Sequence, residues 1–303
     1  MKLFPENIQK IAFVALAGKP EKEKVEFGLK FLNSNGYEVV ICKSVVEENS
    51  VPYLSSDIKT RVSDVHDCWR DKSIDLIFAV RGGYGSAQIL PYIDWNVLKT
   101  RKVPFIGYSD MTAFHLAMCA KKTDTAISGP MIHNLQILAE DSFTLNSLQS
   151  VFHNTQILEP NRKKLLTITE GSAEGKIYPV TLSVLVSLIG TPFFPDLDGS
   201  ILLLEDINEP VYKLDRYFTQ LEHSGILSNI SGLLLGTFSN CGKVTERFEL
   251  FAKISKKLRI PVIANIPFGH TYPRISVKYE SICIIKTSSR NPILIMNNTK
   301  GES

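Results

Sequence analysis

The chain has 303 residues, a formal net charge of +3 at pH 7, and 44% hydrophobic and 21% charged residues. This composition is that of a globular protein, and the length exceeds that of most single cores, so we expect two domains. The charge does not indicate a nucleic-acid partner, because the longest basic run is only residues 162–164. No segment approaches the ~20 apolar residues of a membrane span, so we expect no membrane partner.

The five cysteines follow no Cys-x-x-Cys spacing, and the six histidines follow no metal-binding spacing. An odd, unpatterned set of cysteines is typical of free thiols in a reducing compartment, which favours a cytoplasmic protein without metal or cofactor. An export signal is the alternative, because the apolar residues 11–17 follow Lys2 and Lys10. A buried first strand explains the same seven residues better, since this run is at the shortest limit for a signal.

Strands and helices alternate in the first half, which predicts a parallel sheet covered on both faces. The predicted strands cover residues 11–17, 37–42, 75–80, 103–108 and 125–128, and the predicted helices cover residues 21–35, 58–70 and 110–120. Gly36 just past the first helix and the 55–57 segment before the second are typical helix-end signals. Residues 1–150 are therefore expected to form an α/β domain that binds its ligand at the carboxyl ends of the strands.

Strands are more frequent in the second half. Residues 134–170 show no steady period and are interpreted as a connection with a helix or two. The predicted helices beyond them cover residues 181–188 and 211–221, and the predicted strands cover residues 200–204, 232–235, 261–264, 281–285 and 293–296. We expect residues 170–303 to form a β-rich α/β domain.

Ser109 stands where a predicted strand turns at once into a predicted helix. This arrangement is a nucleophile elbow, which raises one hydroxyl above the sheet and directs backbone N–H groups of the helix toward it. The common elbow reads Gly-x-Ser-x-Gly, whereas Met111 occupies the fifth position here. Ser109 as an ordinary helix N-cap is the alternative.

A glycine-rich segment, Arg81–Gly85, directly follows another predicted strand. Three glycines in four positions let the backbone turn sharply and approach another group closely. As a dinucleotide fingerprint the segment is incomplete, because the third glycine is missing, so nucleotide binding is kept as an alternative. We interpret the segment as an oxyanion loop, in which a glycine N–H pairs with the N–H of Asp110.

Glu205 ends an apolar strand, and His270 lies in the loop after residues 261–264. Taken singly, each is explained by a cap, a surface ion pair or an ordinary loop histidine. Together with Ser109 they give the order Ser, Glu, His, in which a carboxylate orients the imidazole that deprotonates the hydroxyl. His115 and His133 are competing bases, and His115 is expected to pack against the sheet.

Seven motifs resemble, in order, those of the LD-carboxypeptidases, the cytoplasmic murein tetrapeptide carboxypeptidases of serine peptidase family S66. They lie at residues 81–85, 107–110, 128–131, 188–192, 204–209, 225–227 and 268–270. The resemblance implies a nucleophile at Ser109, a carboxylate at Glu205, a base at His270 and oxyanion N–H groups at Gly83 and Asp110. It also implies a flavodoxin- or amidotransferase-like first domain and a swivelling second domain, usually in a homodimer. The activity implied is release of terminal D-alanine from murein tetrapeptide during peptidoglycan recycling.

Substrate recognition is less well defined. Arg81 is a candidate for the terminal carboxylate of a murein peptide, with Tyr84 beside it, but Arg81 equally well pairs with Asp75 or another acid. The chain departs from the family at Pro179–Thr181, where Gly-Gly-Asn is usual, and at Ile275–Tyr279, where Thr-Leu-Pro-x-Gly is usual. Peptide specificity and oligomeric state therefore stay open.

Three other functions are alternatives. One is a sibling hydrolase that cleaves peptide–nucleotide antibiotics and gives self-immunity. It is disfavoured because such relatives carry an aromatic insertion near the site, whereas Trp69 and Trp95 both lie in the first half. The others are a nucleotide-binding protein that uses the glycine-rich segment and a non-catalytic binder that retains the cleft.

Overall fold

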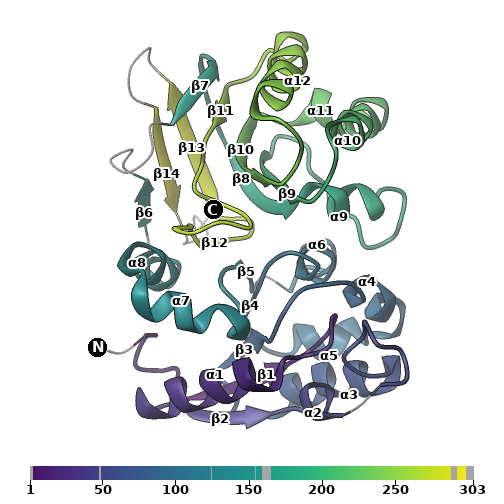
Figure 1. The fold of residues 1–303 in the computed structure, drawn as a ribbon, viewed down its shortest axis with the longest axis vertical. Helices are drawn as coiled ribbons and strands as arrows, with labels where there is room; N and C mark the ends of the chain where they lie inside the picture. The colour runs from purple at the N-terminus through teal and green to yellow at the C-terminus, as the bar shows by residue number, and fades with distance from the viewer. Residues whose placement is uncertain are drawn as a thin grey trace.

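The computed structural model describes residues 3–47, 49–123, 125–153, 155–158, 165–287 and 292–297. It contains two β-sheets, one built mainly by the first half of the chain and one by the second (Figure 1). In Figure 1 the purple and blue first half lies below and the green and yellow second half above. The predicted two-part α/β architecture is confirmed.

The first sheet has the strand order β12-β5-β4-β3-β1-β2. Its strands from the first half are β1 (Lys10–Val14), β2 (Glu38–Ile41), β3 (Leu76–Ala79), β4 (Phe105–Gly107) and β5 (Ala126–Ser128). These five run parallel, as predicted, and β3, β4 and β5 are buried along their whole length. The carboxyl ends of β3 and β4 therefore bring residues 81–85 and Ser109 to one edge.

Helices cover both faces of this sheet. They are α1 (Lys22–Ser34), α2 (Lys43–Val46), α3 (Ile58–Arg70), α4 (Ser86–Ile89), α5 (Trp95–Lys99), α6 (Met111–Ala120), α7 (Leu135–Glu140) and α8 (Ser142–Ser150), with short 3₁₀ turns at Leu90–Tyr92 and Ile132–Asn134. Ala12 and Val14 of β1 belong to one buried cluster, and Ile11 and Phe13 belong to another. Alternate residues of a strand face opposite sides, so apolar packing is required on both.

The second sheet has the order β6-β14-β13-β8-β9-β10-β11-β7. Its strands are β6 (Thr155–Leu158), β7 (Leu166–Thr169), β8 (Gly171–Thr181), β9 (Ile201–Ile207), β10 (Gly232–Ser239), β11 (Val262–Ala264), β13 (Ile282–Thr287) and β14 (Ile293–Asn297). Strands β8 to β11 form a parallel core, and the flanking strands are antiparallel. The helices of this half are α9 (Leu182–Ser187), α10 (Val211–His223), α11 (Ile226–Asn229) and α12 (Val244–Lys257), of which α10, α11 and α12 lie together beside the sheet in Figure 1.

Strand β12 (Val277–Lys278) connects the two halves. It comes from the second half of the chain, yet it pairs antiparallel with β5 in the first sheet. The loop that carries His270 therefore leads directly into the other sheet. The division into domains at residues 1–150 and 170–303 stays a prediction. Among the described residues, no helix has both the length and the apolar character needed to cross a membrane.

Candidate active site

Ser109 occupies a strained turn between β4 and α6. Its φ of 62° lies in the left-handed region, which side chains other than Gly, Asn and Asp rarely adopt. The turn is tight, because a Cβ atom at Gly107 would come within 2.7 Å of Met111. The backbone carbonyl of Ser109 accepts from Thr112 N–H, 2.9 Å away, so the helix begins immediately after it. Its hydroxyl lies 3.0 Å from the His270 ring.

The structure brings Ser109, Glu205 and His270 together from three separate elements. Ser109 follows β4 and His270 lies in the loop after β11, whereas Glu205 lies inside β9, which continues to Ile207 instead of ending before Glu205 as predicted. His270 Nε2 lies 3.0 Å from Ser109 Oγ, and His270 Nδ1 lies 2.8 Å from Glu205 Oε2. The Glu205 side chain is 2% exposed and the His270 side chain 15% exposed. A serine, an imidazole and a buried carboxylate linked in this order can transfer a proton from the hydroxyl to the imidazole.

The backbone around Glu205 fits closely against its carboxylate. Glu205 Oε2 also accepts from the backbone N–H of His270 at 3.2 Å, and Oε1 accepts from the Thr181 hydroxyl. Gly269 has φ 111°, and a Cβ there would lie 2.6 Å from Glu205 Oε2. Asp206 accepts instead from Ser183 N–H at 2.7 Å, and burial raises the pKa of Asp206 to about 6. Only Glu205 of this acidic pair is hydrogen-bonded to the imidazole.

The glycine-rich loop lies directly against Ser109. A Cβ atom at Gly82 would come within 2.9 Å of Ser109 Oγ, so this position requires a glycine. The family resemblance implies Gly83, whose φ is 116°, as the oxyanion donor. The spacing of the glycines alone does not tell which of them meets the serine. The buried Arg61 holds the loop, since its Nη1 donates to the carbonyls of Leu16 at 3.0 Å and Gly85 at 2.9 Å.

Asp110 turns its carboxylate away from the site. Its Oδ2 accepts from the backbone N–H of Ser86 at 2.8 Å, and its carbonyl accepts from the Ser86 hydroxyl. Burial raises the pKa of the Asp110 carboxyl. Its backbone N–H lies near the loop, because a Cβ at Gly82 would be 3.5 Å from it. Asp110 thus offers a backbone donor at the first turn of α6, where N–H groups have no helical partner.

Arg81 and Tyr84 lie on the same loop but do not bond to the three linked residues. Arg81 Nη1 donates to the carbonyl of Lys19 at 3.0 Å and lies 3.6 Å from the Glu21 carboxylate. Glu21 is therefore the acid beside Arg81, while Asp75 accepts from backbone N–H groups at the start of β1. The Tyr84 side chain is exposed, and its ring centroid lies 6.2 Å from that of Tyr53.

The two competing histidines occupy other environments. His115 is fully buried against the rings of Phe105 and Tyr279, as predicted, and burial lowers its pKa to about 3. His133 Nε2 accepts from the backbone N–H of Glu21, and burial together with a nearby cation lowers its pKa to about 4. Among the described residues, no three His, Cys, Asp or Glu side chains gather as metal ligands do.

The Tyr108 ring adjoins the imidazole, and a buried cation lies over that ring. The Tyr108 ring centroid lies 5.0 Å from that of His270. The guanidinium of the fully buried Arg274 lies over the same Tyr108 ring at 3.9 Å and is 5.7 Å from the Phe268 centroid. Burial raises the pKa of Tyr108. No sequence signal identifies this contact, because Arg274 stands in an irregular loop.

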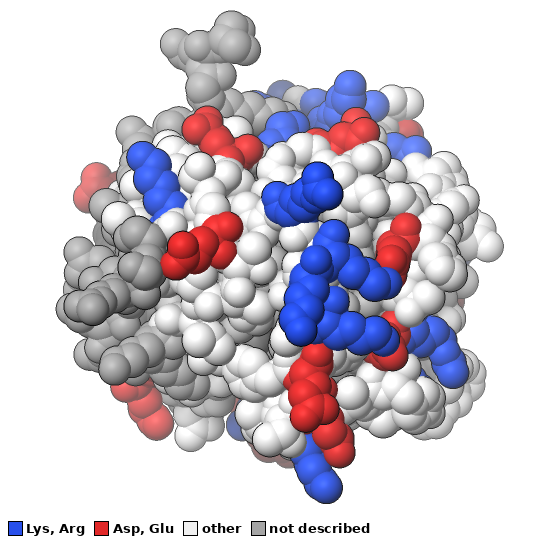
Figure 2. Space-filling model, turned by 90° about the horizontal axis from the view of Figure 1, so that it is seen from above, with Lys and Arg blue, Asp and Glu red and all other residues white. Residues whose placement is uncertain are grey.

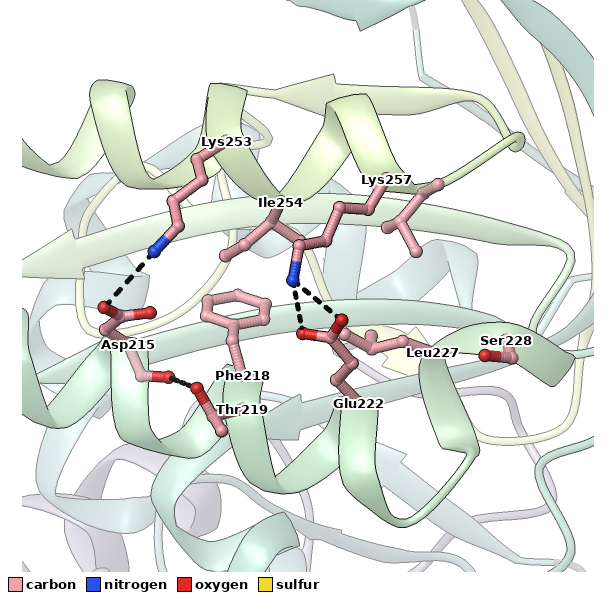
Figure 3. A pocket seen from close by; sticks show the side chains of 10 residues that line it. Asp215, Phe218, Thr219, Glu222, Leu227, Ser228, Lys253, Ile254 and Lys257 are labelled. Atoms are coloured by element: carbon pink, nitrogen blue, oxygen red, sulfur yellow. Dashed lines mark hydrogen bonds and ion pairs between the residues drawn. The ribbon is translucent and has the colours of Figure 1, made fainter.

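A cleft lies between α10 and α12, on helices that flank the second sheet (Figure 3). Its volume is about 110 Å³. Two ion pairs cross it, from Lys253 to Asp215 at 3.8 Å and from Lys257 to Glu222 at 2.7 Å. On the face seen in Figure 2, Lys and Arg side chains gather near the centre with Asp and Glu beside them. This cleft contains none of the three linked residues.

Comparison with known proteins identifies the family. The model of the LD-carboxypeptidase N-terminal domain matches residues 11–129, and that of the LD-carboxypeptidase C-terminal domain matches residues 174–284. A probable murein peptide carboxypeptidase of Bacillus subtilis (strain 168) is 28% identical over 96% of this chain and 93% of that protein.

Solved structures agree with this assignment. The muramoyltetrapeptide carboxypeptidase from Oxalobacter formigenes superposes with a TM-score of 0.83 and 25% identity, covering 95% of this chain and 99% of that one. The microcin C7 self immunity protein MccF has the same fold, with a TM-score of 0.84 and 21% identity over 95% of this chain and 96% of that one. The chain therefore belongs to the LD-carboxypeptidases, peptidase family S66.

Proposed function

We propose that this protein is a serine carboxypeptidase that hydrolyses an L,D peptide bond and releases the terminal D-alanine of murein tetrapeptide. The observation that carries the proposal is the position of His270, which links Ser109 Oγ at 3.0 Å to Glu205 at 2.8 Å. One relative is named a probable murein peptide carboxypeptidase and one solved structure a muramoyltetrapeptide carboxypeptidase, which supports the substrate class.

In the first half of the reaction, His270 Nε2 takes the proton of Ser109 Oγ, which attacks the carbonyl carbon before D-alanine. The negative charge that develops on the carbonyl oxygen is stabilised by the backbone N–H groups of Gly83 and Asp110. His270 then gives its proton to the leaving amine. The C–N bond breaks, D-alanine departs, and the shortened peptide remains as an ester on Ser109.

Water completes the cycle. His270 removes a proton from a water molecule, which attacks the ester carbonyl, and the proton returns to Ser109 Oγ as the ester bond breaks. Glu205 stays ionised throughout and holds the imidazole in the required tautomer. Its burial excludes water from the hydrogen bond to Nδ1, which strengthens this orientation.

Arg81 and Tyr84 are proposed to bind the substrate. The Arg81 side chain is 35% exposed at the edge of the glycine-rich loop, and a guanidinium suits the terminal carboxylate of D-alanine. Binding there would compete with Glu21 for the same cation. The exposed Tyr84 ring offers an apolar contact for the peptide beside it.

The test is D-alanine release from purified murein tetrapeptide, with mass spectrometry of both products. We expect Ser109→Ala and His270→Ala to lower kcat by at least about 10³-fold, since members of a triad act as a unit. His223→Ala, which replaces an exposed histidine on α10, is the matched control and should retain activity. Undiminished D-alanine release by Ser109→Ala would contradict the proposal.

The fold shared with MccF supports a second candidate, hydrolysis of a peptide–nucleotide antibiotic. Offering both substrates to the same preparation distinguishes the two, because the ratio of their kcat/KM values measures specificity directly. A higher value for the peptide–nucleotide would favour self-immunity over peptidoglycan recycling.

We also propose that the enzyme is a cytoplasmic homodimer. All five cysteines are among the described residues and none of them forms a disulfide, which supports a reducing compartment. Cell fractionation tests the location, and light scattering coupled to size exclusion tests the dimer. A monomeric mass at working concentration would overturn the dimer without affecting the reaction proposed above.

A further inference from the structure

Thr181 lies at the carboxyl end of β8, directly beside Glu205 on β9. The two residues are register partners in this parallel pair of strands. Both are buried, and the Thr181 hydroxyl lies 2.5 Å from Glu205 Oε1. Because an ionised carboxylate can only accept hydrogen bonds, the hydroxyl must be the donor. The hydroxyl of Thr181 is therefore committed to the carboxylate.

A threonine hydroxyl at this position would ordinarily cap the helix that follows. Thr181 occupies the N-cap position of α9, where a threonine side chain usually accepts a bond from the first helical turn. No such bond forms here. Asp206 caps the helix instead, accepting from the Ser183 N–H at 2.7 Å and from the Ser183 hydroxyl at 3.2 Å. A neighbouring strand thus supplies the cap and leaves the Thr181 hydroxyl for Glu205.

The first half of the molecule fixes the backbone of Thr181. Its N–H donates to Thr112 Oγ1, which belongs to α6, the helix that begins just after Ser109. The helix that positions the serine therefore also holds the backbone that carries the Thr181 hydroxyl. This places the anchor of Glu205 and the nucleophile on one connected framework.

The two oxygens of Glu205 have separate partners. Oε2 meets His270, at 2.8 Å to Nδ1 and 3.2 Å to the backbone nitrogen, while Oε1 meets Thr181. A carboxylate anchored at one oxygen cannot rotate about its last bond without losing a charge-assisted hydrogen bond. Anchoring Oε1 therefore holds Oε2 in the position from which it orients the imidazole.

We propose that Thr181 is a positioning residue, whose hydroxyl fixes the Glu205 carboxylate so that His270 stays aligned with Ser109. The inference rests on the function proposed above. A residue of this kind acts through Glu205 and does not touch the substrate.

The test compares Thr181→Val, which keeps the shape but removes the hydroxyl, with Thr181→Ser, which restores it. Active sites are counted with a fluorophosphonate, and kcat and KM for D-alanine release are then expressed per active site. We expect Thr181→Val to lower kcat by roughly 10- to 100-fold with KM unchanged, because a hydrogen bond to a charged group is lost. Thr181→Ser should return kcat to within about threefold of the wild type.

Ser183→Ala is the matched control, because it removes a hydroxyl in the same turn that bonds to Asp206 and not to Glu205. It should lower stability while leaving kcat per active site unchanged. Wild-type kcat in Thr181→Val, or an equal loss of kcat in Ser183→Ala, would overturn the inference. Thr181→Ala answers the same question if the valine variant does not fold. Activity that survives in Ser109→Ala would instead contradict the proposed function, so the two failures are distinguishable.

Discussion

At Gly269 the backbone passes so close to the Glu205 carboxylate that no side chain fits. A Cβ there would lie 2.6 Å from Oε2 and 2.7 Å from the Cβ of Glu205. The residue also has φ 111°, a conformation that costs other residues free energy. The glycine before the histidine is thus required by contact as well as by conformation.

Gly269→Ala tests this fit. We expect kcat/KM for D-alanine release to fall at least about 100-fold, because the added methyl group displaces the carboxylate from His270. Gly225→Ala is the matched control, since Gly225 has φ 79° but a Cβ added to it would meet nothing within 4 Å. It carries the conformational cost alone and should leave kcat/KM near the wild-type value. Equal losses in both variants would show that strain, and not contact with Glu205, explains the effect.

At this scale the sequence predicts the reactive side chains better than their supports. Ser109, Glu205 and His270 follow from strand ends and motif order, and the structure brings all three together. The sequence singles out the glycine-rich segment but not the contact of Gly82 with Ser109, and it gives no signal for Arg274. Both contacts depend on how loops from distant segments meet. Side chains that carry chemistry leave a local signal, whereas packing partners do not.

Among the elements, α6 shows how completely the sheet edge is enclosed. Every residue from Met111 to Cys119 is buried, so the helix has no solvent face. His115 lies within it, and burial lowers the pKa of His115 from 6.5 to about 3. The folded protein therefore keeps this imidazole neutral at pH values where the unfolded chain is protonated.

This difference predicts how stability depends on pH. The contribution of neutral His115 to the free energy of unfolding is complete above about pH 6.5. It is lost progressively as the pH falls toward 3, because only the unfolded state binds the proton in that range. At about 1.4 kcal/mol per pH unit, the loss between pH 7 and pH 4 is about 3 kcal/mol. His115→Leu should remove this part of the dependence in urea unfolding curves. If the free energies of unfolding of the wild type and His115→Leu changed with pH in parallel, the role given to His115 would be contradicted.

Element prediction fails where the apolar pattern is weak. The sequence does not predict strand β8. Its first six residues, Gly171–Lys176, are small or charged, and every second one of them is exposed, so they show no apolar pattern. The strand also begins directly after the segment 134–170 that is expected to be a connection. Helix α12 and strands β6 and β7 are likewise not predicted. By contrast, α3 is predicted at residues 58–70 and spans these residues in the structure. Asp57 fixes its beginning, because its side chain accepts from Thr60 N–H.

For the whole molecule, the site depends on how the two sheets are joined. Ser109 comes from the first sheet, whereas Glu205 and His270 come from the second half of the chain. Strand β12 follows the His270 loop and pairs with β5, which adjoins the strand that leads to Ser109. The sequence predicts two α/β parts but not this crossing strand, because two residues are too few to show a period.

The most direct test of this account is the site and rate of fluorophosphonate labelling, measured by peptide mapping of the intact protein. We expect one labelled residue, Ser109, and labelling at least about 100-fold slower in His270→Gln and Glu205→Gln, because both His270 and Glu205 must activate the serine. Circular dichroism shows whether the variants remain folded. A label on another residue, or wild-type labelling of Ser109 in folded His270→Gln, would contradict it.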